Sequence, residues 1–427
     1  MTVTIFRSHI MRRAAVPVMA MAIPLVATAA PAAASSYVPI NGSGSSWPSL
    51  AIDQWAQDLR PAGIVVSYLP DGSAAGRADY MANQDDFAAS DPPFRSRDDK
   101  LGGTGPEHPS QGYSYIPDAA GGTAFAYHLT VHGQPVTNLR LSPRTLMGIF
   151  TGRITNWDSP QITRDYGASL PDLPITPVTH SEGDGGTYFF TRWMAHLFPG
   201  QWNAFCDRVH PGIRPPCGPT EFYPQFGHAR AENGSNNVIA YIASRFGNGA
   251  IGYAEYAYPL NAHIPVLKLR NPAGRYVLPT AASITTTLTQ AVINEDAHSR
   301  NFLQQNLNKV YTYANPRSYP LASYSYLIVP REGTTLPTGF TKAKGRTLSA
   351  FAVYALCRGQ GGGSELVRDA LTAIPAGQLV LAAVAPGNAA SVRALFAAGF
   401  VPLGSLQLFR RADGSSAHKT QPGTDLS

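Results

Sequence analysis

Four turns rich in glycine, serine or aspartate constrain the fold of this chain, because each follows an expected strand and opens an expected helix. They lie at residues 44–46, 72–73, 91 and 183–187. In an open parallel sheet, such turns all lie at the carboxyl edge of the strands, where ligands bind. A single turn is a weak indication, but the repeated strand–helix order predicts an α/β fold with a largely parallel sheet and a ligand site at its edge.

The N-terminal segment has the features of a secretory signal peptide. Three arginines precede an apolar run over residues 14–30, and alanines at 32–34 offer a cleavage site. A membrane anchor is the alternative, but the run is short and two prolines interrupt it. We therefore expect residues 1–34 to be a signal peptide cleaved near Ala34, and the mature protein to be secreted, extracellular or periplasmic.

Charge and motif content disfavour several classes of function. The formal net charge is +6, and removal of a signal peptide with three basic and no acidic residues leaves +3. No cluster of lysine and arginine with interleaved aromatic residues is present, so we expect no nucleic-acid partner. No Ser-His-Asp pattern, zinc-ligand spacing or paired-carboxylate motif can be assigned either. We therefore expect no catalytic residues, no metal and no cofactor.

The three cysteines have different expected roles. Cys206 and Cys217 are separated by ten residues, and in an exported protein such a pair favours a local disulfide over a metal or catalytic site. Cys357 ends the apolar stretch "LSAFAVYALC", so we expect it to be buried and unpaired.

Several motifs follow one another in a familiar order: "NGSGSSWPSLAIDQW", "IFTGRITNWDSPQI", "HSEGDGGTYFFTRWM" and "GAIGYAEYAYP". Over about residues 40–357 the chain resembles the phosphate-binding protein of bacterial phosphate ABC transporters (PstS type). The resemblance implies a two-lobed periplasmic-binding-protein fold of type II, with the ligand in a cleft between the lobes. One lobe would comprise residues 35–120 and 253–357, and the other residues 121–252.

The resemblance also implies a function and a binding site. The chain would be a monomeric exported binding protein for inorganic phosphate or a related oxyanion, feeding or formerly feeding an ABC importer through its permease. Ser46 and Trp47 lie in the first phosphate-binding segment, and Ser73 is the serine that opens a helix. Asp91 takes the place of the carboxylate that accepts the proton of phosphate, a proton that sulfate lacks.

One loop departs from the family's Arg-x-Asp-Gly-Ser-Gly-Thr motif. His180 takes the arginine position and Glu182 the aspartate. Asp184 takes the ligand-binding serine, Gly185 keeps a glycine, and Gly186 takes the threonine. The arginine donors and two hydroxyl donors are therefore missing. The loop could hold phosphate weakly, a different ligand, or an anion together with a cation.

The charged residues of this region leave alternatives open. The side chain of Asp184 could cap the following helix by accepting hydrogen bonds from the N–H groups of the helix, and it would thereby displace phosphate. His180 is expected to be mostly neutral at pH 7, so that acidification towards about pH 5.5 would supply the missing charge. Arg77 could be a substitute cation, although an exposed helix charge is the favoured interpretation.

The C-terminal segment, residues 358–427, is a divergent extension that resembles the acetyl-CoA half of a GNAT acetyltransferase. Export argues against such an enzyme, because its cofactor is cytoplasmic. Two enzymatic alternatives remain for the whole chain. One is a GNAT-type acyltransferase fusion, and the other is a phosphate-ester hydrolase that uses Asp91 and His180.

Overall fold

The computed structural model describes residues 37–331, 333–357, 381–383, 400–402 and 408–411, which all belong to one unit, Tyr37–Ser427. The expected signal peptide lies outside these residues. Most of the segment expected to resemble an acetyltransferase also lies outside them. Three short antiparallel strands of it are described, in the order β16 (Leu381–Ala383), β18 (Leu408–Arg411), β17 (Phe400–Pro402). None of the helices in the described ranges has the length and hydrophobicity needed to span a membrane.

An eight-stranded sheet with the order β2-β1-β3-β15-β4-β10-β8-β9 forms the centre of the structure. Its strands are β1 (Ile40–Gly44), β2 (Val66–Leu69), β3 (Phe87–Ser90), β4 (Tyr113–Tyr127), β8 (Thr176–His180), β9 (Arg230–Glu232), β10 (Ala250–Glu255) and β15 (Ala322–Pro330). The pairs β1–β2, β1–β3, β8–β10 and β8–β9 are parallel, as predicted. The central strands β4 and β15 pair antiparallel with their neighbours, so the sheet is mixed.

Strand β4 joins the two halves of this sheet. It pairs with β15 over residues 113–122 and with β10 over residues 123–127. We call β2, β1, β3 and β15 the first half, and β10, β8 and β9 the second half. One continuous strand thus runs from a half that holds the first three predicted turns to a half that holds the fourth.

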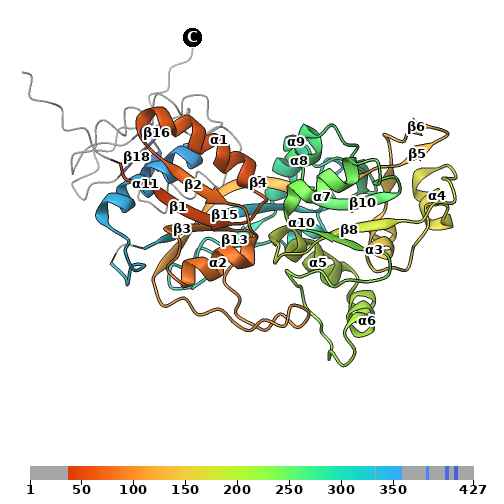
Figure 1. Cartoon of the computed structure of the whole chain (residues 1–427), viewed down its shortest axis with the longest axis horizontal. Helices are drawn as coiled ribbons and strands as arrows, with labels where there is room; N and C mark the ends of the chain where they lie inside the picture. The colour runs from red at the N-terminus through yellow and green to blue at the C-terminus, as the bar shows by residue number, and fades with distance from the viewer. Residues whose placement is uncertain (1–36, 332, 358–380, 384–399, 403–407, 412–427) are drawn as a thin grey trace, which may run out of the picture. The chain divides into compact units, whose positions relative to one another are not determined.

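Helices flank each half of the sheet. Figure 1 shows α1, α2 and α11 around β1 to β3, and α5 and α7 beside β8 and β10. The helices are α1 (Ser49–Leu59), α2 (Ser73–Met81), α3 (Pro143–Phe150), α4 (Pro160–Tyr166), α5 (Gly185–Leu197), α6 (Pro199–Val209), α7 (Gly234–Ala243), α8 (Ala257–Asn261), α9 (Ala281–Leu288), α10 (Asn308–Tyr311) and α11 (Lys342–Cys357), with a 3-10 turn η1 (Arg60–Ala62).

Short strands complete the described structure. They are β5 (Thr130–Val131), β6 (Gln134–Pro135), β7 (Arg140–Leu141), β11 (Lys268–Arg270), β12 (Tyr276–Val277), β13 (Val292–Ile293), β14 (Gln305–Asn306), β16 (Leu381–Ala383), β17 (Phe400–Pro402) and β18 (Leu408–Arg411). Strand β11 pairs in parallel with β7, which precedes α3. The chain therefore returns to the region of β7 and α3 after it has completed β10.

Hydrophobic packing follows the spacing of apolar residues. In α1, Ile52, Trp55 and Leu59 are buried at helical spacing, and they pack with Phe351 of α11 over the first half of the sheet. A larger core spans both halves and contains, among other aromatic rings, Phe125 of β4, whose ring centroid lies 5.0 Å from that of Phe190 in α5. The predicted α/β class is therefore confirmed.

The predicted disulfide is confirmed. Cys206 in α6 is bonded to Cys217, and both side chains are buried. The side chain of Cys357, at the end of α11, lies outside the described part of the structure, so its expected burial stays a prediction.

Reduction of this disulfide should lower the free energy of unfolding by about 2–4 kcal/mol, because the bond restricts the unfolded chain. Urea unfolding with and without a reductant measures the change. In the variant Cys206→Ala/Cys217→Ala, the reductant should have no further effect. An unfolding midpoint that stays the same on reduction of the unmodified protein would contradict this expectation.

Candidate functional site

The eight residues predicted for the site lie close together, at the ends of strands from both halves of the sheet. Ser46 and Trp47 follow β1, Ser73 opens α2 after β2, and Asp91 follows β3. The remaining four surround the connection from β8 to α5: His180 ends β8, Asp184 precedes α5, and Gly185 and Gly186 open this helix. A β-carbon on Gly185 would overlap the Asp91 carboxylate, and one on Gly186 would lie 3.9 Å from Trp47 Cδ1.

The turn after β1 is held by hydroxyl groups. Ser45 Oγ donates to Asp91 Oδ2 at 2.8 Å and accepts from the N–H of Trp47 at 3.1 Å. Ser46 Oγ lies 2.9 Å from Ser235 Oγ at the start of α7, which comes from the other half of the sheet. The sequence reasoning named Ser46 but missed Ser45 and Ser235. The serine run after Gly44 was a signal for Ser45, but none pointed to Ser235.

Asp91 is a buried carboxylate with an acidic neighbour. Its side chain is 1% exposed, and its Oδ1 has no hydrogen-bond partner among the described residues. Burial, together with repulsion from the Asp184 carboxylate, raises the pKa of Asp91 to about 7. Burial and Asp91 likewise raise the pKa of Asp118, a residue of β4 that the sequence reasoning missed, to about 8. The site is therefore rich in proton acceptors.

Asp184 caps helix α5. Its backbone has extended dihedral angles, and its Oδ2 accepts the N–H of Thr187 at 2.6 Å. The N-cap interpretation is thus confirmed. Since the first N–H groups of a helix have no intrahelical acceptor, those of Gly185 and Gly186 stay suited to bind an anion. A carboxylate of the protein itself already satisfies one donor at this helix start.

His180 is buried between two carboxylates. Its Nδ1 lies 2.7 Å from Glu182 Oε1 and 3.7 Å from Asp184 Oδ1, and its Nε2 lies 3.0 Å from the carbonyl oxygen of Tyr253. Burial alone would lower the pKa of His180, but the carboxylates of Asp184 and Glu182 raise it to about 9. The expectation of a mostly neutral imidazole is therefore wrong. Acidification from pH 7 to 5.5 adds almost no charge at this residue.

Arg77 is neither the exposed helix charge nor the substitute cation that the sequence suggested. Its side chain is fully buried, which excludes an exposed helix charge. Its guanidinium contacts Glu107 at 2.8 Å, Glu221 at 2.7 Å and Ser90 Oγ at 2.8 Å. These two carboxylates engage the cation, so it is no free substitute for the missing arginine. The partners are 30 and 144 positions away in the sequence, where no local pattern marks them.

The start of α2 contacts the loop before α5. The N–H of Ala74 donates to the carbonyl oxygen of Gly183 at 3.0 Å. A β-carbon on Gly183 would overlap that of Ala74, so glycine is required for this approach. A helix that follows the first half of the sheet and a loop that follows the second half therefore meet directly beside the predicted site.

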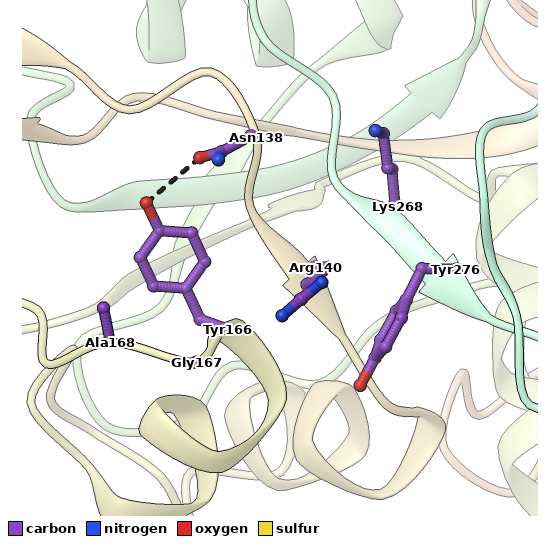
Figure 2. Close-up of a pocket in the computed structure, with 7 residues that line it drawn as sticks. All are labelled: Asn138, Arg140, Tyr166, Gly167, Ala168, Lys268 and Tyr276. Atoms are coloured by element: carbon purple, nitrogen blue, oxygen red, sulfur yellow. Dashed lines mark hydrogen bonds between the residues drawn. The ribbon is translucent and has the colours of Figure 1, made fainter.

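Two surface pockets lie away from these residues. One has a volume of about 430 Å³, and its lining includes Arg140, Lys268 and Tyr276. Figure 2 shows the hydrogen bond from Tyr166 to Asn138 at its edge. The other, of about 550 Å³, is lined by residues around Asp99 and Arg214. Neither pocket contains a residue predicted for the site.

Comparison with known proteins gives one matching family and related sequences. The model of the family described as "PBP superfamily domain" matches residues 26–358. The phosphate-binding protein PstS of Xylella fastidiosa (strain Temecula1) is 28% identical over 298 residues, which cover 69% of this chain and 72% of the relative. The protein of the same name from Methanocaldococcus jannaschii is 24% identical over 331 residues, covering 76% and 80%.

Solved structures show the same fold. A high-affinity periplasmic phosphate-binding protein solved with bound phosphate has a TM-score of 0.54 and 18% identity, covering 79% of this chain and 90% of that one. A structure described as a DING protein has a TM-score of 0.52 and 19% identity, covering 86% and 96%. The predicted two-lobed periplasmic-binding-protein fold is confirmed.

Proposed function

This chain belongs to the PBP superfamily domain family, and we propose that it is an exported binding protein for phosphate or a related oxyanion. The observation that carries the proposal is the meeting of α2 and α5, whose N-termini lie beside Asp91 and the serines after β1. Helix N-termini attract anions through their N–H groups and their dipoles. The names of the relatives support phosphate as the anion.

Six of the eight predicted residues would contact the oxyanion directly in this proposal. Ser46 and Ser73 supply hydroxyl donors, and the N–H groups of Gly185 and Gly186 add backbone donors. The N–H of Trp47 would exchange its bond to Ser45 Oγ for one to the anion. Asp91 accepts the proton of a protonated oxyanion, which favours phosphate over sulfate because sulfate carries no proton near neutral pH. The contacts between α2 and the loop before α5 would separate to admit the ligand and close again over it.

The wider assignments belong to the same proposal. The signal peptide would be cleaved near Ala34, and the mature monomer would deliver its ligand to the permease of an ABC importer. Residues 35–120 with 253–357, and residues 121–252, are proposed as the two lobes; the pairing of β11 with β7 adds a contact between these segments. Binding without catalysis agrees with the relatives, which are named as binding proteins.

Calorimetry with phosphate and sulfate tests the proposal. Asp91→Asn should weaken phosphate binding at least tenfold and reduce the preference over sulfate, because an amide donates where the carboxylate only accepts. The exposed Asp172, whose Oδ1 accepts from Asn156 at 2.6 Å, provides the control Asp172→Asn, which should bind as the unmodified protein does. The proposal fails if the unmodified protein binds neither anion. Turnover of a chromogenic phosphomonoester would favour the hydrolase instead.

A further inference from the structure

Three side chains that can bind a metal ion occupy alternate positions from the last residue of β8 to the residue before α5. His180, Glu182 and Asp184 each offer one ligand atom, and these atoms lie within 4.8 Å of one another. No other group of three such side chains is as close in the part of the chain that the structure describes. No metal was expected from the sequence, because no zinc-ligand spacing could be assigned, although an anion together with a cation was one alternative for this loop.

The imidazole is oriented as in many metal sites. His180 Nε2 is engaged by the carbonyl oxygen of Tyr253 at 3.0 Å, which leaves Nδ1 towards Glu182 Oε1 and Asp184 Oδ1. A histidine that binds a metal usually donates its other N–H group to a carbonyl or carboxylate. In the absence of a metal ion, a proton on Nδ1 takes the place between the imidazole and the two carboxylates.

An unsatisfied carboxylate oxygen of the group independently points to a ligand. The Glu182 side chain is 6% exposed, and its Oε2 has no hydrogen-bond partner among the described residues. Its Oε1 already accepts from the N–H of Gly234 at 3.0 Å and contacts His180. A buried carboxylate oxygen without a donor is costly, and a cation bound by both oxygens of Glu182 would satisfy it.

The charges around the group also favour a cation. The Asp91 carboxylate interacts repulsively with that of Asp184. The buried cation Arg77 is already bound by Glu107 and Glu221. With a neutral imidazole, these three residues therefore present two carboxylates and a nitrogen lone pair beside Asp91.

We propose that His180, Glu182 and Asp184 bind a divalent transition-metal ion, with Zn²⁺ as the probe, and that this ion adds positive charge to the oxyanion site at the start of α5. The claim that the ion adds charge to the oxyanion site rests on the proposed function. One imidazole and two carboxylates suit Zn²⁺, and three protein ligands leave a coordination position for an oxygen of the anion.

The change needed to admit the ion is small. Ligand atoms about 2.0–2.2 Å from a tetrahedral Zn²⁺ are separated by about 3.3 Å. The distance from His180 Nδ1 to Glu182 Oε1 must therefore increase from 2.7 Å, while the 3.7 Å to Asp184 Oδ1 must decrease slightly. Asp184 can keep its cap on α5 through Oδ2 while Oδ1 turns to the ion.

Titration of the EDTA-treated secreted protein with ZnCl₂ alone tests the metal site. One Zn²⁺ per chain should bind, and Glu182→Gln and Asp184→Asn should each weaken its affinity at least tenfold. Both variants keep an oxygen acceptor, and asparagine is a good N-cap, so folding should be preserved. Glu232→Gln is the matched control, because Glu232 pairs with the exposed Arg230 on neighbouring β9. Absence of Zn²⁺ binding, or equal affinity in all variants, would overturn the site.

Calorimetry with phosphate on protein loaded with one Zn²⁺, compared with the metal-free protein, tests the coupling. Phosphate affinity should be at least tenfold higher with the ion, and this gain should disappear in Glu182→Gln. Equal affinity with and without Zn²⁺ would overturn the coupling and leave the proposed function standing. Absence of phosphate binding in both forms would refute the proposed function, while the titration with Zn²⁺ alone still decides the metal site.

Discussion

Arg77→Ala is expected to lower the free energy of unfolding by about 3–5 kcal/mol. The guanidinium is fully buried and bonded to Glu107 and Glu221, whose side chains are 5% and 1% exposed. Removal of one partner from a buried ion pair leaves an uncompensated charge in the interior. Because such a charge is costly, the expected loss of unfolding free energy is large. Arg95 contacts both carboxylates at 2.7 and 3.3 Å, but it is partly exposed and cannot replace the lost hydrogen bonds.

Urea unfolding measures this effect, and two comparisons identify its cause. Arg230→Ala removes the exposed partner of Glu232 and should leave the unfolding midpoint unchanged, because exposed ion pairs contribute little. The triple variant Arg77→Met/Glu107→Gln/Glu221→Gln removes all three charges and should recover part of the loss. A decrease below about 1 kcal/mol in Arg77→Ala would show that water or other groups satisfy the two carboxylates.

The proximity of the candidate site residues could be predicted from the sequence because their signals are local. A glycine- or serine-rich turn between a strand and a helix is encoded within a few residues, as for Ser73 and for residues 183–187. The cap at Asp184 has the same origin, since an N-cap bonds to an N–H group only three residues ahead. The order of these turns then places them at one edge of the sheet.

The pairings within the site could not be predicted, because they join distant segments. The sequence of α2 alone predicts an exposed charge at Arg77. Its burial depends on Glu221, which lies 144 positions later. Asp118 belongs to a strand that links the two halves of the sheet, which no local pattern indicated. The charge of His180 could not be predicted for an electrostatic reason. Burial lowers the pKa of this imidazole, but the carboxylates at positions 182 and 184 raise it above its usual value, and their contact with the imidazole depends on the fold.

Asp184→Ser should strengthen phosphate binding in metal-free buffer. Serine is a good N-cap, so α5 should keep its start while a negative charge next to the anion is removed. The serine hydroxyl also adds a donor. A hydrogen bond to a charged group contributes about 1.5–3 kcal/mol, which corresponds to an affinity gain of about 10- to 150-fold.

His180→Arg, added to Asp184→Ser, should increase the affinity further, because both nitrogens of His180 are engaged by Glu182 and Tyr253 and cannot reach a ligand. A guanidinium has five donors, so some would remain for the oxyanion. Calorimetry in EDTA-containing buffer measures both variants, with Asp172→Ser as the exposed control. The double variant should also lose any response to Zn²⁺, since two of the three proposed ligands are gone.

Tight phosphate binding by the unmodified metal-free protein, unchanged by Asp184→Ser, would show that the start of α5 does not contact the ligand. The carboxylate of Asp184 would then be only a helix cap, and the acceptor-rich residues around Asp91 would need a ligand that brings its own donors.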